Sequence, residues 1–281
     1  MLHALKSLIL LCLLAIPQAA FAQDRLPTLN IVQSGHSLTD DIRAPLTQFV
    51  RAQAMRGGRL DKATLPGSPM DWRWRNATDP DIRQPGVMAQ YDVLVLTERV
   101  PLSRTFGPHK SPDWALRWTE HAWTSGQVRT VLYASWVDWT SGPGAANPHS
   151  DPEGNVPFRD RLPLEMARWQ QIQDHVNANL PAGAPSVPMI PGPLIMAAAY
   201  DEIAAGTAPG MGAISDLFAD HIHLNPMGAY LIALAHFAVI YDADPRGLPH
   251  GVPARGGPDA QQAAWMQDLV WRVLQQTRSD R

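Results

Sequence analysis

The stretch Thr28–Asp41, TLNIVQSGHSLTDD, contains the change from strand to helix on which the fold prediction rests. Its first half is a short apolar run typical of a buried strand, which we place at Thr28–Gln33, and the run stops just before Gly35. Apolar side chains then recur at three- and four-residue intervals as far as Ala54, which predicts a helix. One of the two aspartates that end the stretch, Asp40 or Asp41, is expected to cap that helix.

Strands and helices alternate along the rest of the chain. Apolar runs predict strands at 91–97, 127–133 and 186–190, and helical spacing predicts helices at 112–125, 162–180, 193–204, 226–241 and 259–275. This alternation predicts an α/β domain whose mostly parallel sheet is covered by helices on both faces. We expect a single domain over 23–281, with a long loop at about 140–161. Ligand sites of such sheets lie at the carboxyl ends of the strands.

Composition narrows the classes of function. The chain has 281 residues, 45% of them hydrophobic and only 17% charged, so a large core is available. The formal net charge of -3 provides no field that would attract nucleic acid, and we expect no such partner. No unit recurs at a fixed spacing, which argues against a repeat architecture. The oligomeric state is not predicted.

The N-terminus has the pattern of a secretory signal peptide over residues 1–22. Lys6 precedes the apolar run Leu8–Ile16, and Ala20-Phe21-Ala22 is a small-residue cleavage site. The run is too short to cross a bilayer, so we expect cleavage after Ala22, a secreted or periplasmic protein and no stable membrane anchor. The only cysteine, Cys12, would be removed with this segment, which excludes a thiol nucleophile or a disulfide in the mature chain.

Ser37 is the first candidate for chemistry. It follows Gly35 and His36 at the turn between the first strand and its helix, where a hydroxyl projects from the sheet edge. The alternative is that Ser37 only caps the helix, a common use of serine.

A second candidate group is the segment Asp220–Pro226, DHIHLNP, just ahead of a helix capped by Asn225. A carboxylate three residues before an imidazole can accept its Nδ1 proton and leave Nε2 free to act on a serine, which suggests Asp220 and His223. One alternative is a His-x-His metal pair, His221 and His223, with Asp216 or Asp220 as third ligand. Another is that Asp220 merely caps a turn.

Together these segments resemble the SGNH or GDSL-type hydrolases, a serine esterase and lipase superfamily. The first motif of that family, Gly-Asp-Ser-Leu, appears as Gly35-His36-Ser37-Leu38, and its last, Asp-x-x-His, as Asp220–His223. The resemblance implies a three-layer α/β/α sandwich of the flavodoxin-like kind with about five strands. It also implies ester hydrolysis by Ser37, His223 and Asp220, with no metal or cofactor. The oxyanion hole would use the amides of Ser37 and Gly67.

The third motif of the family, Gly-x-Asn-Asp, is degenerate here. The chain has Thr97-Glu98-Arg99-Val100 after the predicted central strand, so no asparagine amide is available for the oxyanion. We expect Glu98 to be turned away from the oxyanion or neutralised by Arg99 or Arg73, because a carboxylate aimed at it would oppose catalysis.

The ten tryptophans suggest a carbohydrate ester as substrate, because indole faces suit sugar rings. The side chains expected near the mouth of the site are His36, Trp72, Trp74, Thr97, Glu98, Trp136 and Trp139. The prediction is thus an exported serine esterase for an acyl ester, such as an acetyl ester, of a small molecule or carbohydrate. The alternatives are a non-catalytic glycan-binding protein on the same fold and a His-x-His metalloenzyme.

Overall fold

The structure is a computed structural model that describes residues 26–53, 58–251 and 253–279. The predicted signal peptide, its cleavage site after Ala22 and Cys12 lie outside the described residues, as does Ala54 at the end of the first predicted helix. None of the helices in the described ranges is long and apolar enough to span a bilayer.

A five-stranded sheet forms the centre of the molecule, and every pair of neighbouring strands is parallel. The strand order is β2-β1-β3-β4-β5. The strands are β1 (Ile31–Gly35), β2 (Leu60–Thr64), β3 (Val93–Leu96), β4 (Arg129–Ala134) and β5 (Met189–Pro191). The predicted parallel α/β sheet is therefore confirmed.

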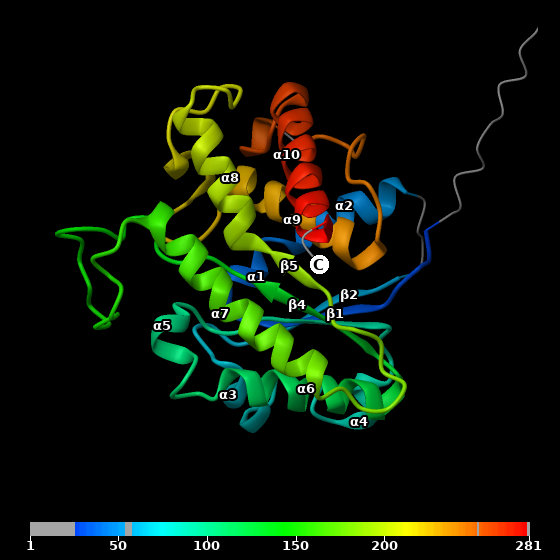
Figure 1. Cartoon of the computed structure of the whole chain (residues 1–281). Coiled ribbons are helices and arrows are strands. Elements are labelled where there is room, and N and C mark those ends of the chain that lie inside the picture. The colour runs from blue at the N-terminus through cyan, green and yellow to red at the C-terminus, as the bar shows by residue number, and fades with distance from the viewer. Residues whose placement is uncertain (1–25, 54–57, 252, 280–281) are drawn as a thin grey trace, which may run out of the picture.

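Helices cover both faces of this sheet and give three layers (Figure 1). One face carries α2 (Arg43–Ala52), α8 (Gly192–Ala204), α9 (Pro226–Tyr241) and α10 (Ala260–Ser279). The other carries α3 (Met70–Arg75), α4 (Pro85–Met88), α6 (Ser111–Gly126) and α7 (Phe158–Ala178). Four short helices complete the described elements: α1 (Ser37–Asp40), α5 (Leu102–Thr105), η1 (Ile214–Leu217) and η2 (Pro253–Arg255).

Alternation along the strands divides the core in two. On β3, Val93 and Val95 pack with the side chains of α2, α8 and α9, whereas Leu94 and Leu96 pack with those of α6 and α7. Such alternation follows from the two-residue period of a strand, and both faces are apolar because both are covered by helices.

The sequence prediction was wrong at β2 and at the first helix. β2 was not predicted because an edge strand needs no apolar run, and only Ala63 in its LDKAT sequence is fully buried. The first predicted helix is two helices, α1 and α2, and neither Asp40 nor Asp41 is its N-cap. The expected cap of α9 is confirmed, since Asn225 Oδ1 accepts hydrogen bonds from the amides of Met227 (2.9 Å) and Gly228 (3.1 Å).

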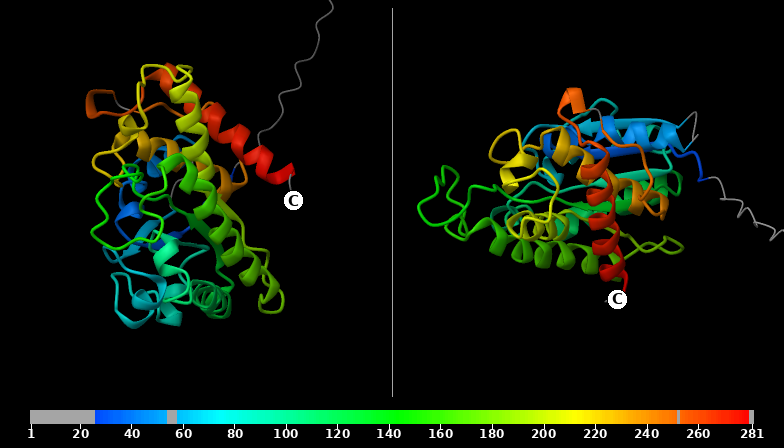
Figure 2. Two further views of the ribbon diagram at one scale, coloured as in Figure 1. Left: turned by 60° about the vertical axis from the view of Figure 1, so that its left-hand side comes forward. Right: turned by 90° about the horizontal axis from the view of Figure 1, so that it is seen from above.

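The connection between β4 and α7 covers residues 135–157 and contains most of the predicted loop, whereas residues 158–161 belong to α7. It projects from the body of the molecule beyond the start of α7 (Figures 1 and 2). Loops of this length usually have a function. This one follows β4 and so lies at the carboxyl ends of the strands, where ligand sites of such sheets are found.

Close packing of α9 against η1 yields a prediction about stability. A Cβ on Gly228 would lie 2.2 Å from the carbonyl oxygen of Leu217, so Gly228→Ala requires backbone movement. We expect it to lower the free energy of unfolding by about 2–3 kcal/mol, measured by urea denaturation. The control is Gly86→Ala in α4, where a Cβ meets nothing within 4 Å. Equal stability of the two variants would contradict the prediction.

Candidate active site

Ser37 lies directly after β1 and is the first residue of α1, not its cap. The cap is His36, whose Nε2 lies 3.0 Å from the carbonyl oxygen of Glu98 and whose Nδ1 lies 3.4 Å from the amide of Leu38. A carbonyl only accepts, so Nε2 carries the proton and Nδ1 accepts from Leu38. Burial lowers the pKa of His36 to about 4, so the neutral form that this arrangement needs is retained at neutral pH.

The Ser37 hydroxyl meets His223. Ser37 Oγ lies 2.8 Å from His223 Nε2, although the two residues are 186 positions apart in the sequence. Gly35 makes the turn before Ser37 feasible, since a Cβ there would lie 2.1 Å from Thr39 Oγ1. The Ser37 hydroxyl is therefore hydrogen-bonded to an imidazole, and His36, not Ser37, caps the helix.

Asp220 holds the other side of the same imidazole. Its Oδ2 lies 2.7 Å from His223 Nδ1, and its Oδ1 accepts from the amides of Ile222 (2.8 Å) and His223 (2.7 Å). Burial acts to raise the pKa of Asp220, but these hydrogen bonds outweigh it and lower the pKa to about 2. An ionised Asp220 keeps the proton of neutral His223 on Nδ1, so Nε2 is the acceptor of the Ser37 hydroxyl.

His221 is the other histidine of the 220–226 segment. It lines the same cavity but forms no hydrogen bond with Ser37. Across the described parts of the chain, no group of three or more His, Cys, Asp or Glu side chains is arranged to hold a metal ion. The His-x-His pair is therefore split, with only His223 directed at Ser37.

A cavity of about 470 Å³ opens beside Ser37 and His223. It is lined by Gly67, by residues 99–101 and 104, and by residues of the loop before α7, including Asn147 and His149. Gly67 has a φ of +62°, and neither its amide nor that of Ser37 donates a hydrogen bond to another described residue. Both expected oxyanion donors thus border the cavity with free N–H groups.

The four tryptophans expected to contact substrate do not line this cavity. Trp136 is fully buried, and its Nε1 donates to the carbonyl of Ile222 (2.9 Å), while Trp139 Nε1 donates to that of Asp220 (2.7 Å). These two indoles fix the segment that carries His223. Trp74 packs edge-on against Trp118, and Trp72 is 56% exposed on α3. The predicted indole contacts with substrate are not supported at this cavity, because Trp136 and Trp139 use their N–H groups within the protein, Trp74 packs against other rings, and Trp72 lies at the surface of α3.

Thr97 and Glu98 are also buried behind the cavity wall, so their predicted contact with substrate was wrong, whereas His36 does line the cavity. Glu98 Oε1 accepts from the amides of Met70 (2.9 Å) and Arg99 (2.7 Å). Burial raises the pKa of Glu98, and the neighbouring Arg73 opposes that shift. As expected, the carboxylate is turned to other donors, although the partner at Arg99 is its backbone and not its guanidinium.

Arg73 joins the strand ends beneath the site. It is fully buried, donates to Ser34 Oγ (3.2 Å) and to the carbonyl of Ser68 (2.5 Å), and also donates to the carbonyl of Thr97. Burial lowers its pKa to about 10, which still leaves it charged at neutral pH. Its acceptors, which also include Ser68 Oγ (3.3 Å), belong to the end of β1, the end of β3 and the Gly67 turn, so one side chain fixes the relative positions of these three segments.

The segment after Glu98 is anchored at several points. Arg99 donates its amide to Glu98 and accepts at its carbonyl from Thr105 Oγ1 (2.6 Å). The amide of Leu102 donates to both carboxylate oxygens of Glu165, at 3.0 Å each. The side chains of Arg99 and Arg104, which the sequence analysis did not select as site residues, line the cavity from this segment.

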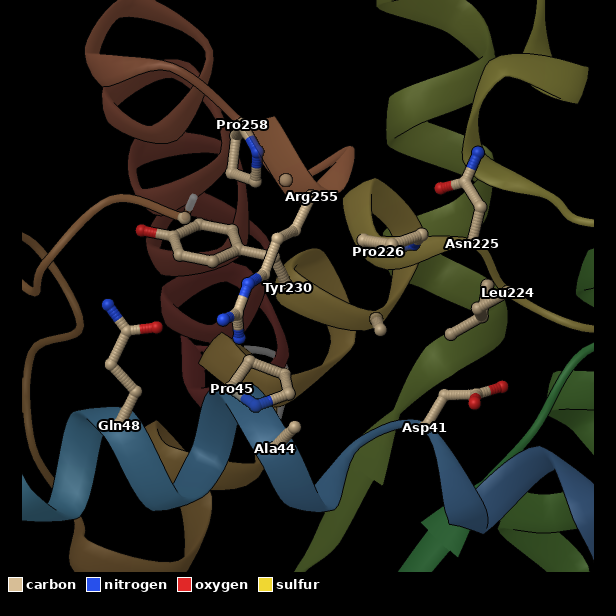
Figure 3. A pocket seen from close by; sticks show the side chains of 13 residues that line it. Asp41, Ala44, Pro45, Gln48, Leu224, Asn225, Pro226, Tyr230, Arg255 and Pro258 are labelled. Atoms are coloured by element: carbon tan, nitrogen blue, oxygen red, sulfur yellow. The ribbon is translucent and has the colours of Figure 1, made fainter. Parts of the chain in front are cut away.

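A second cavity of about 410 Å³ lies between α2 and the segment before α10 (Figure 3). Its charged lining is Asp41 and Arg255, and Figure 3 shows the Arg255 side chain extending toward Pro45 and Tyr230. It is not lined by Ser37 or His223, so the chemistry described above belongs to the first cavity alone.

No protein-family model matches the chain, and no curated protein matches it. Among solved structures it is similar to a DUF4886 family protein from Bacteroides uniformis ATCC 8492, with a TM-score of 0.61 and 12% identity over 88% of this chain and 95% of that one. This likeness shows that the two chains share a fold. A putative SGNH hydrolase from Slackia heliotrinireducens has a TM-score of 0.48 and 17% identity, covering 76% of this chain and 99% of its own. An acetyl xylan esterase, AlAXEase, has a TM-score of 0.49 and 15% identity, covering 74% and 98%.

The anchoring carboxyl of Glu165 predicts a dependence of stability on pH. Burial raises its pKa from 4.5 to about 7, so between these values the folded protein binds a proton that the unfolded chain has lost. The free energy of unfolding should therefore fall as pH rises from about 4.5 to 7, by on the order of 3 kcal/mol from this group. Glu165→Gln keeps an oxygen acceptor for Leu102 and should remove that part of the slope in urea titrations at several pH values. An unchanged slope would contradict the prediction.

Proposed function

We propose that this protein is a serine esterase that hydrolyses acyl esters through Ser37, His223 and Asp220. The observation that supports it most is the continuous chain of hydrogen bonds from Asp220 through His223 to the Ser37 hydroxyl, at 2.7 and 2.8 Å. Ser37 borders an open cavity, so an ester carbonyl can reach its oxygen.

In the proposed reaction Ser37 Oγ attacks the ester carbonyl while His223 Nε2 takes its proton. Asp220 remains ionised and stabilises the imidazolium that forms. His223 then gives the proton to the leaving alcohol, and an acyl-enzyme remains on Ser37. A water molecule, deprotonated by His223 in turn, releases the acid and restores the hydroxyl.

The negative oxygen of the tetrahedral intermediate needs donors. The amides of Ser37 and Gly67 are the proposed pair, because both border the cavity and neither donates within the described part of the protein. The turned-away carboxylate of Glu98 removes the objection that the degenerate third motif would place a negative charge at the oxyanion.

The alternatives are less well supported. A non-catalytic binding protein would have no need of a serine, an imidazole and a carboxylate in hydrogen-bonded order. The carbohydrate substrate was inferred from tryptophans that lie elsewhere, so it is not part of the proposal. A chelator test addresses the metalloenzyme, because ethylenediaminetetraacetate should leave serine-dependent hydrolysis unchanged.

Replacement of the nucleophile tests the proposal directly. Ser37→Ala should lower kcat for 4-nitrophenyl acetate by at least about 1000-fold, because the covalent route is lost. It should also abolish labelling by a fluorophosphonate, read by intact-protein mass spectrometry. Ser186→Ala, at an exposed serine before β5, is the matched control and should behave as wild type. Hydrolysis that survives in Ser37→Ala, or wild-type protein that neither hydrolyses nor reacts with the phosphonate, would refute the proposal.

We also propose that the enzyme is exported and loses residues 1–22. The pattern of Lys6, the apolar run and Ala20-Phe21-Ala22 supports this. Expression of the full chain in a bacterial host should give a product in the periplasm or the medium whose mass corresponds to an N-terminus at Gln23. A product that stays in the cytoplasm with Lys6 still present would contradict export.

A further inference from the structure

Two arginines in the wall of the proposed active site have no partner. Most arginines of the described chain form a hydrogen bond, an ion pair or a ring contact. Those whose side chains form none are Arg51, Arg99, Arg104 and Arg255. Arg99 and Arg104 both line the cavity beside Ser37 and His223. A guanidinium group binds carboxylates and phosphates through its planar set of N–H donors. Two such groups without a partner in a cavity wall are therefore available to a ligand.

The surrounding charges leave this pair in excess. Asp151 also lines the cavity, but it is bound by Arg161 at 2.5 Å and by Ser103 Oγ at 2.5 Å, so these two charges compensate each other. Asp138 is the other acidic lining residue, and it accepts from the amide and hydroxyl of Thr140 (2.8 and 2.7 Å). His149 and His221 are the remaining titratable neighbours besides His36 and His223. Two guanidinium groups, those of Arg99 and Arg104, thus face one carboxylate without a cationic partner, that of Asp138. The cavity wall therefore has one positive charge in excess.

The segment that carries the two arginines is held in place before any ligand binds. Glu98 accepts the amide of Arg99, Thr105 Oγ1 donates to the carbonyls of Arg99 and Pro101, and Glu165 accepts the amide of Leu102. Two buried carboxyl groups therefore fix the backbone of this segment and leave its guanidinium groups free. Both arginine side chains are only partly exposed, which strengthens their attraction for an anion.

We propose that Arg99 and Arg104 form a subsite for a carboxylate, so that the substrates are esters with a negatively charged carboxylate on the acyl or the alcohol side. This inference rests on the proposed esterase function. A carboxylate accepts the paired N–H donors of a guanidinium in one plane, and its single charge equals the excess in the cavity. A positively charged site on a chain of net charge -3 also attracts such an anion specifically to the cavity.

Matched carboxylate and carboxamide esters test the proposal, because the members of a pair differ in charge and hardly in shape. For the alcohol side the pair is 4-acetoxybenzoate and 4-acetoxybenzamide. For the acyl side it is monomethyl terephthalate and methyl 4-carbamoylbenzoate. At constant ionic strength, kcat/KM should be at least about 10-fold higher for the carboxylate member of one pair, mainly through KM.

Variants connect this preference to the arginines. Arg99→Met and Arg104→Met should each reduce the carboxylate-to-carboxamide ratio by about 10-fold, roughly the effect of one charge-assisted hydrogen bond. Arg51→Met removes an exposed, unpartnered arginine of α2 that does not line the cavity, and it should retain the wild-type ratio. Thermal unfolding by circular dichroism checks that each variant folds, and Arg104→Met decides the question if Arg99→Met does not.

Two outcomes would overturn the subsite: a ratio near one in wild type for both pairs, and a ratio that neither arginine variant changes. If the ratio stays constant because Arg99→Met lowers kcat/KM equally for both members, Arg99 would instead be assigned to the oxyanion. Calorimetric binding of 4-hydroxybenzoate and 4-hydroxybenzamide separates this inference from the proposed function. If no ester is hydrolysed, preferential binding of the carboxylate that is lost in the arginine variants still supports the subsite. If no ester is hydrolysed, equal or absent binding of both compounds refutes it.

Discussion

Parallel pairing of β1 with both of its neighbours determines where everything else lies. Gly35 at the end of β1 pairs with Thr64 of β2, and Ser34 pairs with Leu96 of β3, so the carboxyl ends of these three strands lie side by side. Parallel strands can only be connected by crossovers, which return the chain each time to the side of the sheet where the strands begin. The segments that follow the strands therefore all lie on the side where the strands end. The Ser37 turn, the Gly67 turn and the Arg99 segment are three of these.

The buried guanidinium of Arg73 holds these segments together. Placing a guanidinium in the interior costs several kcal/mol unless its donors are satisfied, so Arg73 is tolerated only while its acceptors remain in position. Those acceptors are Ser34 Oγ and the carbonyls of Ser68 and Thr97, with Glu98 as the nearest source of opposite charge. Any displacement of the Gly67 turn from the end of β1 would break these bonds. Arg73 is thus a positioning residue for both proposed oxyanion donors, although it does not touch the cavity.

The sequence allowed the sheet and the hydrogen-bonded serine, histidine and aspartate to be predicted because each depends on local patterns. Ser37 follows an apolar strand and a glycine, and Asp220 and His223 lie within four residues of one another. The edge strand β2 and the tryptophans were not predictable in the same way. Whether an indole such as Trp139 faces a ligand or a carbonyl depends on residues 81 positions away. The availability of Arg99 and Arg104 likewise depends on which carboxylates lie near them, and spacing along the chain does not contain that information.

The buried carboxylate of Glu98 and the free side chain of Arg99 are connected through the backbone of one short segment. Glu98 and Arg99 follow β3 directly, and their two side chains have different surroundings: Glu98 is fully buried, whereas Arg99 lines the cavity. Here Glu98 uses one carboxylate oxygen to bind the amides of both Met70 and Arg99, which ties the Arg99 segment to the start of α3. A side chain that could not accept hydrogen bonds at this position would leave two buried amides unsatisfied. The carboxylate at position 98 is therefore explained by the backbone it holds, and this leaves the side chain at position 99 free to interact with the cavity.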